Sequence, residues 1–156
     1  MPVPSDSAGA IIALNVVRAV IDTNVIAGSL LRGEGQNRAI LRACFEGRIR
    51  PVVGQSLFLE HEDVLGREQL FRKSPLSSLE RRQLFEAFLS VCDWVPVYYL
   101  WRPNLRDEGD NHIVELAVAG AASMIVTNNI ADFRGAELRF PEIRVLRPPD
   151  ALKELS

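Results

Sequence analysis

The sequence predicts an α/β fold, a three-layer α/β/α sandwich in which helices cover both faces of a central, mostly parallel sheet. Two observations support this prediction. From Val16 onward, short apolar segments of strand length alternate with longer segments of helical periodicity, and this alternation is typical of parallel strands joined by helical crossovers. The chain has 156 residues, which is long enough for one domain with its own core and too short for two.

The first fifteen residues lack this pattern. Residues 1–9 are turn-prone, and the apolar segment Ala10–Leu14 is far shorter than a membrane span and follows no basic stretch. Neither a signal peptide nor a membrane anchor is expected from such a segment. We therefore expect a flexible N-terminal extension over residues 1–15 and a single domain over residues 16–156.

The first half of the domain begins with a strand over Val16–Ile21, a β-branched run of the kind that is buried on both faces of a sheet. The polar segment 22–24 ends that strand and can cap a helix over Val25–Arg32. A second helix is expected over Asn37–Glu46. A strand over Arg50–Val53 and a third helix from about Gly54 to Leu65 follow.

The second half repeats the alternation. Leu84, Phe85, Phe88, Leu89 and Cys92 have the spacing of a core-facing helical stripe and place a helix over Ser77–Val91. The remaining elements follow from short apolar runs and their polar boundaries: a strand over Trp94–Tyr99, a loop over Arg102–Gly109, a helix over Asn111–Ala119, and strands over Ser123–Thr127 and Ile143–Leu146.

Acidic or amide side chains come after nearly every strand, at the edge where ligands bind in parallel α/β sheets. Carboxylates gathered at one edge repel each other unless they share a cation, and Mg²⁺ or Mn²⁺ selects such oxygen donors. Capping or solvation explains any one of these acids, but their recurrence predicts a Mg²⁺ or Mn²⁺ site. The acids and amides are Asp22, Asn24, Glu60, Glu62, Asp63, Asp107, Glu108, Asp110, Asn128, Asn129 and Asp132.

Periodicity narrows this set only in part. In the third helix Asp63 points away from the apolar face, whereas Glu60 and Glu62 lie on its opposite edges, so spacing does not choose between them. Asp110 precedes the core-facing side of its helix, and Glu115 is expected to project elsewhere. The loop acids at 107 and 108 are interpreted as solvated.

Charge and the remaining residue types exclude several other classes of function. The net charge of −2 provides no general attraction for nucleic acid. Only two cysteines occur, without a CxxC motif, so neither a disulfide framework nor a zinc site is expected and a reducing cytoplasm is the default. His61 and His112 have no partners at ligand spacing, and no Ser-His or Cys-His pair is recognisable.

The sequence resembles PIN-domain ribonucleases, in particular VapC-like toxins of bacterial toxin–antitoxin pairs, from about Arg18 to Leu155. The resemblance depends on four segments: residues 20–26 (VIDTNVI), Glu60 followed by residues 63–65, Asp110-Asn111 before an apolar helix, and residues 125–129 (IVTNN) with Asp132. It implies a Mg²⁺- or Mn²⁺-dependent endoribonuclease with Asp22, Glu60 and Asp110 as metal ligands, and so favours Glu60 over Glu62. Asn24 and Thr127 would support the same pocket.

Asn129 departs from the family pattern, which often has Asp at that position. A carboxamide brings no charge and would weaken a second metal site. Asp132, three residues later, could supply the charge as a further metal ligand and catalytic residue, or it could only cap the following segment. A non-catalytic RNA-binding or scaffold module with the PIN fold is therefore the alternative function.

Two other enzyme classes fit less well. A haloacid-dehalogenase-type phosphotransferase needs a second Asp where Asn24 stands, and a receiver domain needs a late Lys near the core, whereas Lys153 lies far beyond the last strand.

The resemblance also implies an RNA substrate, a cognate antitoxin and a homodimer, with no membrane partner. Apolar residues in excess of what one sheet face needs occur between Ser56 and Ser90, which favours an interface there. These residues are Leu57, Phe58, Leu70, Phe71, Leu76, Leu79, Phe85 and Phe88. Basic side chains at Arg32, Arg38, Arg42, Arg67, Arg72 and Lys73 could grip the RNA backbone, although an ordinary solvated or salt-bridged helix face also explains each of them.

Overall fold

The computed structural model describes the backbone of residues 16–97 and 108–155, and their side chains except at 108–111 and 136–138. The N-terminal extension expected over residues 1–15 lies outside this part of the chain, as do residues 102–107 of the loop expected over Arg102–Gly109, Asp107 among them.

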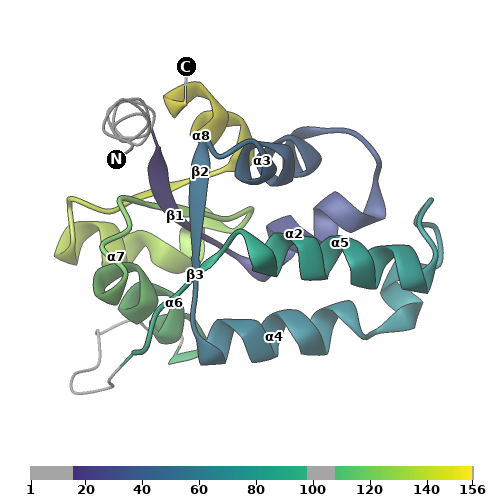
Figure 1. Cartoon of the computed structure of the whole chain (residues 1–156). Helices are drawn as coiled ribbons and strands as arrows, with labels where there is room; N and C mark the ends of the chain where they lie inside the picture. The colour runs from purple at the N-terminus through teal and green to yellow at the C-terminus, as the bar shows by residue number, and fades with distance from the viewer. Residues whose placement is uncertain (1–15, 98–107, 156) are drawn as a thin grey trace, which may run out of the picture.

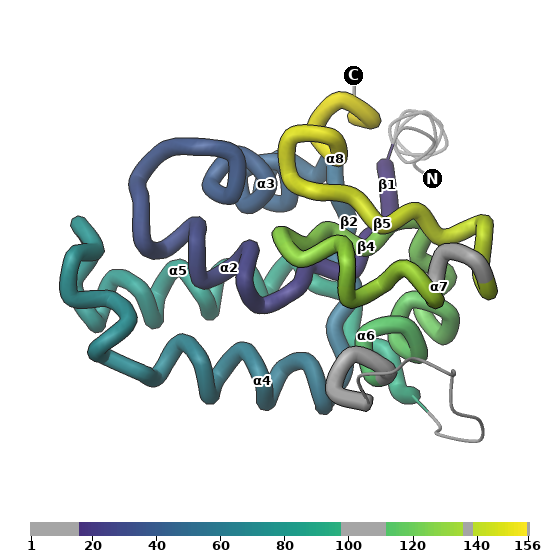
Figure 2. The backbone as a smooth tube through the Cα atoms, turned by 180° about the vertical axis from the view of Figure 1, so that it is seen from behind, coloured from purple at the N-terminus to yellow at the C-terminus, as the bar shows by residue number. Residues whose placement is uncertain are grey.

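A five-stranded parallel sheet forms the centre of the molecule, as predicted. Its order is β3-β2-β1-β4-β5, and every neighbouring pair is parallel. The chain thus builds outward from β1 to β3 and then returns to place β4 on the other side of β1. Strands β1, β2 and β3 are labelled in Figure 1, and β4 and β5 are labelled in Figure 2. The strands are β1 (Val17–Ile21), β2 (Ile49–Val53), β3 (Asp93–Trp94), β4 (Met124–Val126) and β5 (Arg144–Leu146).

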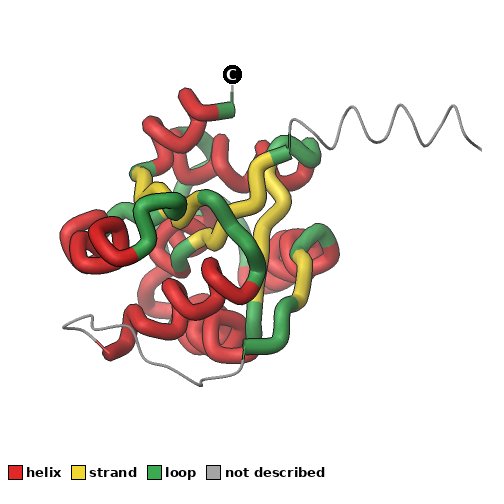
Figure 3. Tube along the Cα trace, turned by 90° about the vertical axis from the view of Figure 1, so that its left-hand side faces the viewer, coloured by secondary structure: helices red, strands yellow, loops and turns green. Residues whose placement is uncertain are grey.

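Helices cover both faces of the sheet and give the predicted three layers. The helices α3 and α8 contact each other, and α6 contacts β1, β2 and β4. Figure 1 shows α3 and α8 on one side of the sheet and α6 on the other. Figure 3 shows the strands between the two sets of helices. The helices are α2 (Thr23–Leu31), α3 (Gln36–Phe45), α4 (Gln55–Leu65), α5 (Ser78–Ser90), α6 (Glu108–Ala119), α7 (Arg134–Arg139) and α8 (Pro148–Glu154), with 3-10 turns η1 (Glu68–Phe71) and η2 (Ile130–Phe133). Within the described ranges, none of the helices combines the length and the apolar character that crossing a membrane requires.

Strand boundaries differ from the prediction mainly at the edge of the sheet. The strand expected over Trp94–Tyr99 is only Asp93–Trp94, and residues 95–97 carry no strand. The last hydrogen bond that joins this edge to β2 within the described part is from the Val95 N–H to the Val53 carbonyl, at 2.9 Å. Residues 98–99 of the expected strand lie outside the described part.

Helix α6 corrects two predictions. It begins at Glu108, so Glu108 and Gly109 are helical rather than part of a loop. Glu115, expected to project away from the core, is buried with 3% of its surface exposed. The physical reason is that residues 113–117 are all buried, because α6 contacts both the sheet and α4 and leaves no solvent-facing side at this turn.

The C-terminal elements η2, α7 and α8 were not predicted from the sequence. Helix α8 begins at Pro148. Proline is well suited to the first position of a helix because the N–H that it lacks would have no partner there.

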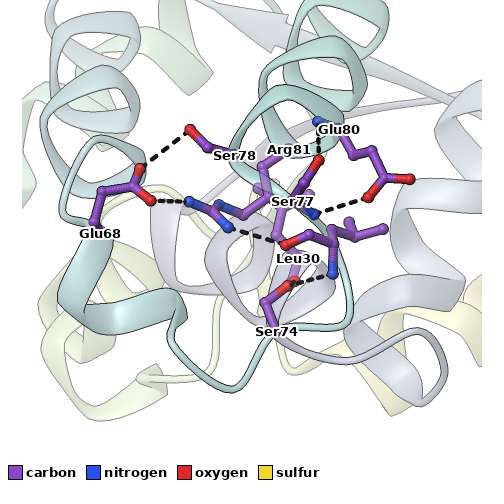
Figure 4. A network of polar contacts seen from close by, with 8 residues as sticks. Leu30, Glu68, Ser74, Ser77, Ser78, Glu80 and Arg81 are labelled. Atoms are coloured by element: carbon purple, nitrogen blue, oxygen red, sulfur yellow. Dashed lines mark hydrogen bonds and ion pairs between the residues drawn. The ribbon is translucent and has the colours of Figure 1, made fainter.

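A hairpin of α4 and α5 extends from the sheet beside α2 (Figures 1 and 2). Its tip is held by Arg81, a buried side chain that donates to Glu68 at 2.5 Å and to the Leu76 carbonyl at 3.0 Å. Ser74 donates to the Leu30 carbonyl and so fastens the tip to the end of α2. Figure 4 shows this network, together with the capping box that Ser77 and Glu80 form at the start of α5.

The hairpin also corrects the estimate of free apolar surface between Ser56 and Ser90. Leu57, Phe71 and Phe88 are at most 3% exposed and belong to the interior. Leu70 and Leu79 are about half exposed or more. The excess apolar surface is therefore smaller than the sequence suggested, because the hairpin contributes Leu57 and Phe88 to the main hydrophobic core.

Candidate functional site

Asp22 lies at the topological switch point of the sheet, where β2 and β3 follow on one side of β1 and β4 and β5 lie on the other. It follows β1 directly, and its backbone N–H donates to the Val126 carbonyl at the end of β4, at 2.9 Å. Strands β1 and β4 are the neighbours from which the chain leads away in opposite directions, and the crevice at the carboxyl ends of such strands is where open α/β sheets bind ligands. The fold therefore places Asp22 in the crevice of this sheet.

The Asp22 carboxylate is held by three hydrogen bonds of different strength. Its Oδ1 accepts from the Thr23 N–H at 2.8 Å, which makes Asp22 the N-cap of α2. Its Oδ2 accepts from the Thr127 hydroxyl at 2.7 Å and, at a longer 3.4 Å, from the Asn24 amide. Only 8% of Asp22 is exposed, so the carboxylate is fixed in direction by neutral donors from both β-strand ends.

Residues after β4 continue the network outward. The Thr127 hydroxyl accepts from the Asn129 N–H at 3.0 Å, and the Asn129 amide donates to Asp132 at 2.7 Å. Asp132 is exposed in the turn η2. The structure thus connects Asp132 to the crevice through Asn129 and Thr127, and Asp132 is not among the groups that act on the pKa of Asp22.

Glu60 reaches the same region from α4. Its Oε1 lies 3.1 Å from His112 Nε2 on α6, and Thr23 on α2 is near enough to help lower the pKa of its carboxyl. The backbone N–H of Thr23 donates to Asp22, and its hydroxyl lies 2.7 Å from His61 Nδ1. Three elements, α2, α4 and α6, meet at Glu60.

The two carboxylates have pKa values shifted in opposite directions. Burial raises the pKa of Asp22, and the negative charge of Glu60 raises it further, against the hydrogen bonds from Thr127 and Thr23. The hydrogen bond from His112, followed by a smaller contribution from Thr23, lowers the pKa of Glu60 despite partial burial. Asp22 is thus a buried anion near a second anion, and a cation bound between them would relieve its electrostatic strain.

His61 lies in the interior directly behind this pair. It is 1% exposed, its Nδ1 lies 2.7 Å from the Thr23 hydroxyl, and its ring meets Phe85 and Phe88 edge-on. Burial lowers its pKa from 6.5 to about 4. The ring is therefore neutral at physiological pH.

Glu62 and Asp63 face a different part of the surface from Glu60. They line a groove of about 660 Å³ between α4 and α5, together with apolar residues such as Phe58, Leu65 and Phe85. Asp63 also pairs with Arg67 at 2.5 Å. Periodicity did not distinguish Glu60 from Glu62, but their positions differ: Glu60 lies near Asp22 and His112, whereas Glu62 lines the groove.

Asp110 falls in the first turn of α6, and its side chain lies outside the described set. His112, two residues later on the same helix, contacts Glu60, so the start of α6 is close to the acidic pair. Among the side chains that the structure does describe, no three His, Cys, Asp or Glu groups are arranged to hold a metal ion. The carboxylates of Asp22 and Glu60 offer oxygen ligands, a chemistry that fits Mg²⁺ or Mn²⁺, and His112 Nε2 is engaged with Glu60.

The predicted basic residues fall into two groups. Arg38 is partly buried and donates to the Ser29 carbonyl at 2.8 Å, which ties α3 to α2, and Arg67 is occupied by Asp63. The others, which are Arg32, Arg42, Arg72 and Lys73, are exposed.

Sequence reasoning missed both histidines. The burial of His61 could have been found, because Leu57, His61 and Leu65 recur every four residues on one face of α4. No local pattern pairs His112 with Glu60, because these residues are 52 positions apart and belong to different helices.

Comparison with known proteins agrees with this geometry. The family model described as PIN domain matches residues 18–131. Among solved structures, the crystal structure of VapBC2 from Rickettsia felis bound to a DNA fragment from their promoter is similar with a TM-score of 0.56 and 16% identity, covering 84% of this chain and 98% of that one. No curated protein matches the sequence.

The buried, neutral His61 predicts a specific dependence of stability on pH. The unfolded chain takes up a proton as pH falls below 6.5, whereas folded His61 stays neutral down to about pH 4. Stability is therefore lost as pH falls through this window, by roughly 3 kcal/mol. In urea unfolding with EDTA, His61→Phe should reduce the loss between pH 7 and pH 4 by about this amount. Equal losses for the two proteins would contradict the neutral buried state.

Proposed function

The chain belongs to the PIN-domain family, and from that premise we propose that it is a Mg²⁺- or Mn²⁺-dependent endoribonuclease, the toxin of a toxin–antitoxin pair. The observation that carries the proposal is the pairing of Asp22 with Glu60 at the crevice between β1 and β4, where burial and the charge of Glu60 both raise the pKa of Asp22. Such a pair is poised for a hard cation.

Asp22, Glu60 and Asp110 would hold the ion. When bound, it would lower the pKa of a coordinated water and neutralise charge that develops on the scissile phosphate. The short hydrogen bond from Thr127 would keep Asp22 Oδ2 in place, while Oδ1 remains committed to the start of α2. His112 would hold Glu60 from the other side.

Asp132 would supply additional negative charge at the outer edge of the site. Its hydrogen bond with Asn129 supports this role, because Asn129 is itself bonded to Thr127 beside Asp22. Asp132 would act more weakly than Asp22 or Glu60, since it is exposed and reaches the crevice through two intermediates.

An RNA substrate would be bound by exposed basic side chains. Unlike Arg38, which donates to the Ser29 carbonyl, these side chains form no such hydrogen bond within the described part of the chain. Arg32 follows α2, and Arg42 lies on α3. Because these would be phosphate contacts, they would set affinity rather than sequence preference.

An antitoxin partner is supported by the resemblance to VapC-like toxins and by the solved VapBC2 structure on promoter DNA. The groove between α4 and α5, which is lined by both apolar and charged residues, is the surface that we assign to protein partners. A cytoplasmic location is consistent with two buried free thiols, Cys44 and Cys92.

The central experiment compares acids that differ in position but not in chemistry. Asp22→Asn and Glu60→Gln should abolish cleavage of RNA at saturating Mn²⁺, because each removes a charged metal ligand. Glu62→Gln, on the same helix but facing the groove, is the matched control and should cleave like the wild type. Asp132→Asn should show an intermediate loss.

Two results would contradict the assignment. Activity in Glu60→Gln together with its loss in Glu62→Gln would mean that the wrong edge of α4 had been chosen. RNA binding by the wild type without any cleavage at Mn²⁺ concentrations that saturate the protein would instead favour the non-catalytic module, for which Asn129 is the motivating residue.

A second prediction concerns stability. A divalent cation binds only the folded protein and relieves repulsion between Asp22 and Glu60, so Mn²⁺ should raise the melting temperature and EDTA should reverse the change. At a Mn²⁺ concentration of 100 times Kd, the gain in unfolding free energy should be about 2.7 kcal/mol. A melting temperature that responds to neither reagent would be incompatible with a shared metal site.

A third prediction concerns assembly. We expect a homodimer that uses part of the α4–α5 hairpin, where Leu59, Leu70 and Leu79 remain exposed. Light scattering at high micromolar protein concentration should give about twice the chain mass of 17.4 kDa, and the mass of a single chain would overturn the dimer. Leu79→Asp should shift the equilibrium toward the monomer.

A further inference from the structure

We propose that Asn37, on α3, is a positioning residue that anchors the segment after β4 and so keeps the Thr127 hydroxyl on Asp22. Asn37 acts through Asn128, the residue that directly follows Thr127. The consequence for cation binding rests on the proposed metal-dependent function. The anchoring itself is a property of the metal-free protein and is measured without a cation.

Asn128 is held from two sides. Its backbone N–H donates to Asn24 Oδ1 on α2 at 3.1 Å, and its side-chain Nδ2 lies 3.5 Å from the same oxygen. The Nδ2 also donates to Asn37 Oδ1 on α3, at 3.1 Å. Because Asn128 is exposed, these hydrogen bonds rather than burial define its position. The segment after β4 is therefore fastened to the first turns of both α2 and α3.

The orientation of these three amides follows from one backbone group. A backbone N–H only donates, so the Asn24 atom that faces the Asn128 N–H is the carbonyl oxygen. The same oxygen faces the Asn128 side chain, which therefore presents its NH₂ group, and Asn37 accepts through Oδ1. Asn24 Nδ2 is left facing Asp22 Oδ2 at 3.4 Å and the Thr127 hydroxyl at 3.5 Å. Each amide thus has one orientation that satisfies its neighbours.

The anchored segment carries a short contact of the candidate site. Thr127, immediately before Asn128, donates to Asp22 Oδ2 at 2.7 Å, and its oxygen accepts from the Asn129 N–H at 3.0 Å. Movement of the backbone at Asn128 would displace both neighbours, because they share its planar peptide bonds. Asp22 would then lose the hydroxyl that fixes the direction of its carboxylate, and outer contacts of this kind tune metal affinity.

Gly28 supplies the space that Asn37 occupies. It lies inside α2, where glycine is less favourable than alanine. A Cβ at this position would lie 2.2 Å from Asn37 Nδ2 and 2.9 Å from its Cγ, well inside van der Waals contact. The glycine is therefore explained by the close approach of the Asn37 amide, an observation independent of the hydrogen bonds to Asn128.

The first measurement uses the metal-free protein. In EDTA, amide hydrogen exchange at Asn128 and Asn129 reports on the anchor, because both N–H groups are hydrogen-bonded. We expect Asn37→Ala to accelerate exchange at both positions about fivefold. Asn37→Asp keeps the acceptor oxygen and should restore most of the protection. Gln36→Ala is the matched control: it removes an exposed amide from the same turn of α3 and should leave exchange unchanged.

Gly28→Ala tests the same anchor by a different route. Helix propensity alone would make it stabilise α2, but its Cβ would displace the Asn37 amide. Exchange at Asn128 and Asn129 should therefore accelerate as in Asn37→Ala. The double variant of Gly28→Ala with Asn37→Ala removes the collision, and its exchange should be no faster than that of Asn37→Ala alone. Additive accelerations would overturn the inference.

The affinity for Mn²⁺, measured by calorimetry, connects the anchor with the candidate site. Asn37→Ala and Gly28→Ala should each weaken Mn²⁺ binding about threefold or more, because the support of Asp22 is loosened. Asn37→Asp should bind more tightly than Asn37→Ala, and Gln36→Ala should bind like the wild type.

The two readouts separate this inference from the function on which it rests. Exchange at Asn128 and Asn129 that Asn37→Ala leaves unchanged would overturn the anchor. Accelerated exchange with Mn²⁺ affinity at the wild-type value would overturn its role in the site. A wild-type protein that binds no Mn²⁺, yet loses protection in Asn37→Ala, would overturn the metal-dependent function while supporting the anchor.

Discussion

The pairing of β1 with β4 is the constraint on which the candidate site depends. These strands are far apart in the sequence, yet the Thr127 hydroxyl after β4 donates to the Asp22 carboxylate after β1 across 105 positions of the chain. The parallel register sets Ile21 opposite Val126, so the residues that follow both strands emerge at the same height. Without this register Asp22 would be an ordinary helix cap.

Helix α4 connects the crevice with the rest of the molecule through three of its faces. Glu60 lies beside Asp22, His61 points into the core, and Glu62 lines the groove toward α5. Neighbouring residues on a helix differ in direction by about 100°, and this alone sends three consecutive side chains into three environments. Because Phe85 both lines the groove and touches His61, the groove and the acidic pair share a common wall.

Burial and charge act differently on the two acids because their partners differ. Asp22 is surrounded by neutral donors, which orient the carboxylate but do not compensate its charge, whereas Glu60 has a histidine at 3.1 Å and more contact with solvent. In a low-dielectric crevice the negative charge of Asp22 is therefore left uncompensated, and a bound cation would stabilise it. This uncompensated charge is the physical basis for proposing a cation site beside Asp22.

The sequence by itself determined the fold class, the strands β1, β2, β4 and β5 to within two residues, and the position of Asp22 after β1. Hydrophobic periodicity is a local signal and needs no knowledge of distant contacts. It could not choose between Glu60 and Glu62, and it misjudged Glu115 because it assumed that α6 has a solvent side. The resemblance to PIN domains favoured Glu60, and only the tertiary structure shows where Glu60, Glu62 and Glu115 lie and what His61 and His112 contact. Each depends on which elements pack against a helix, and packing partners distant in the chain leave no trace in local spacing.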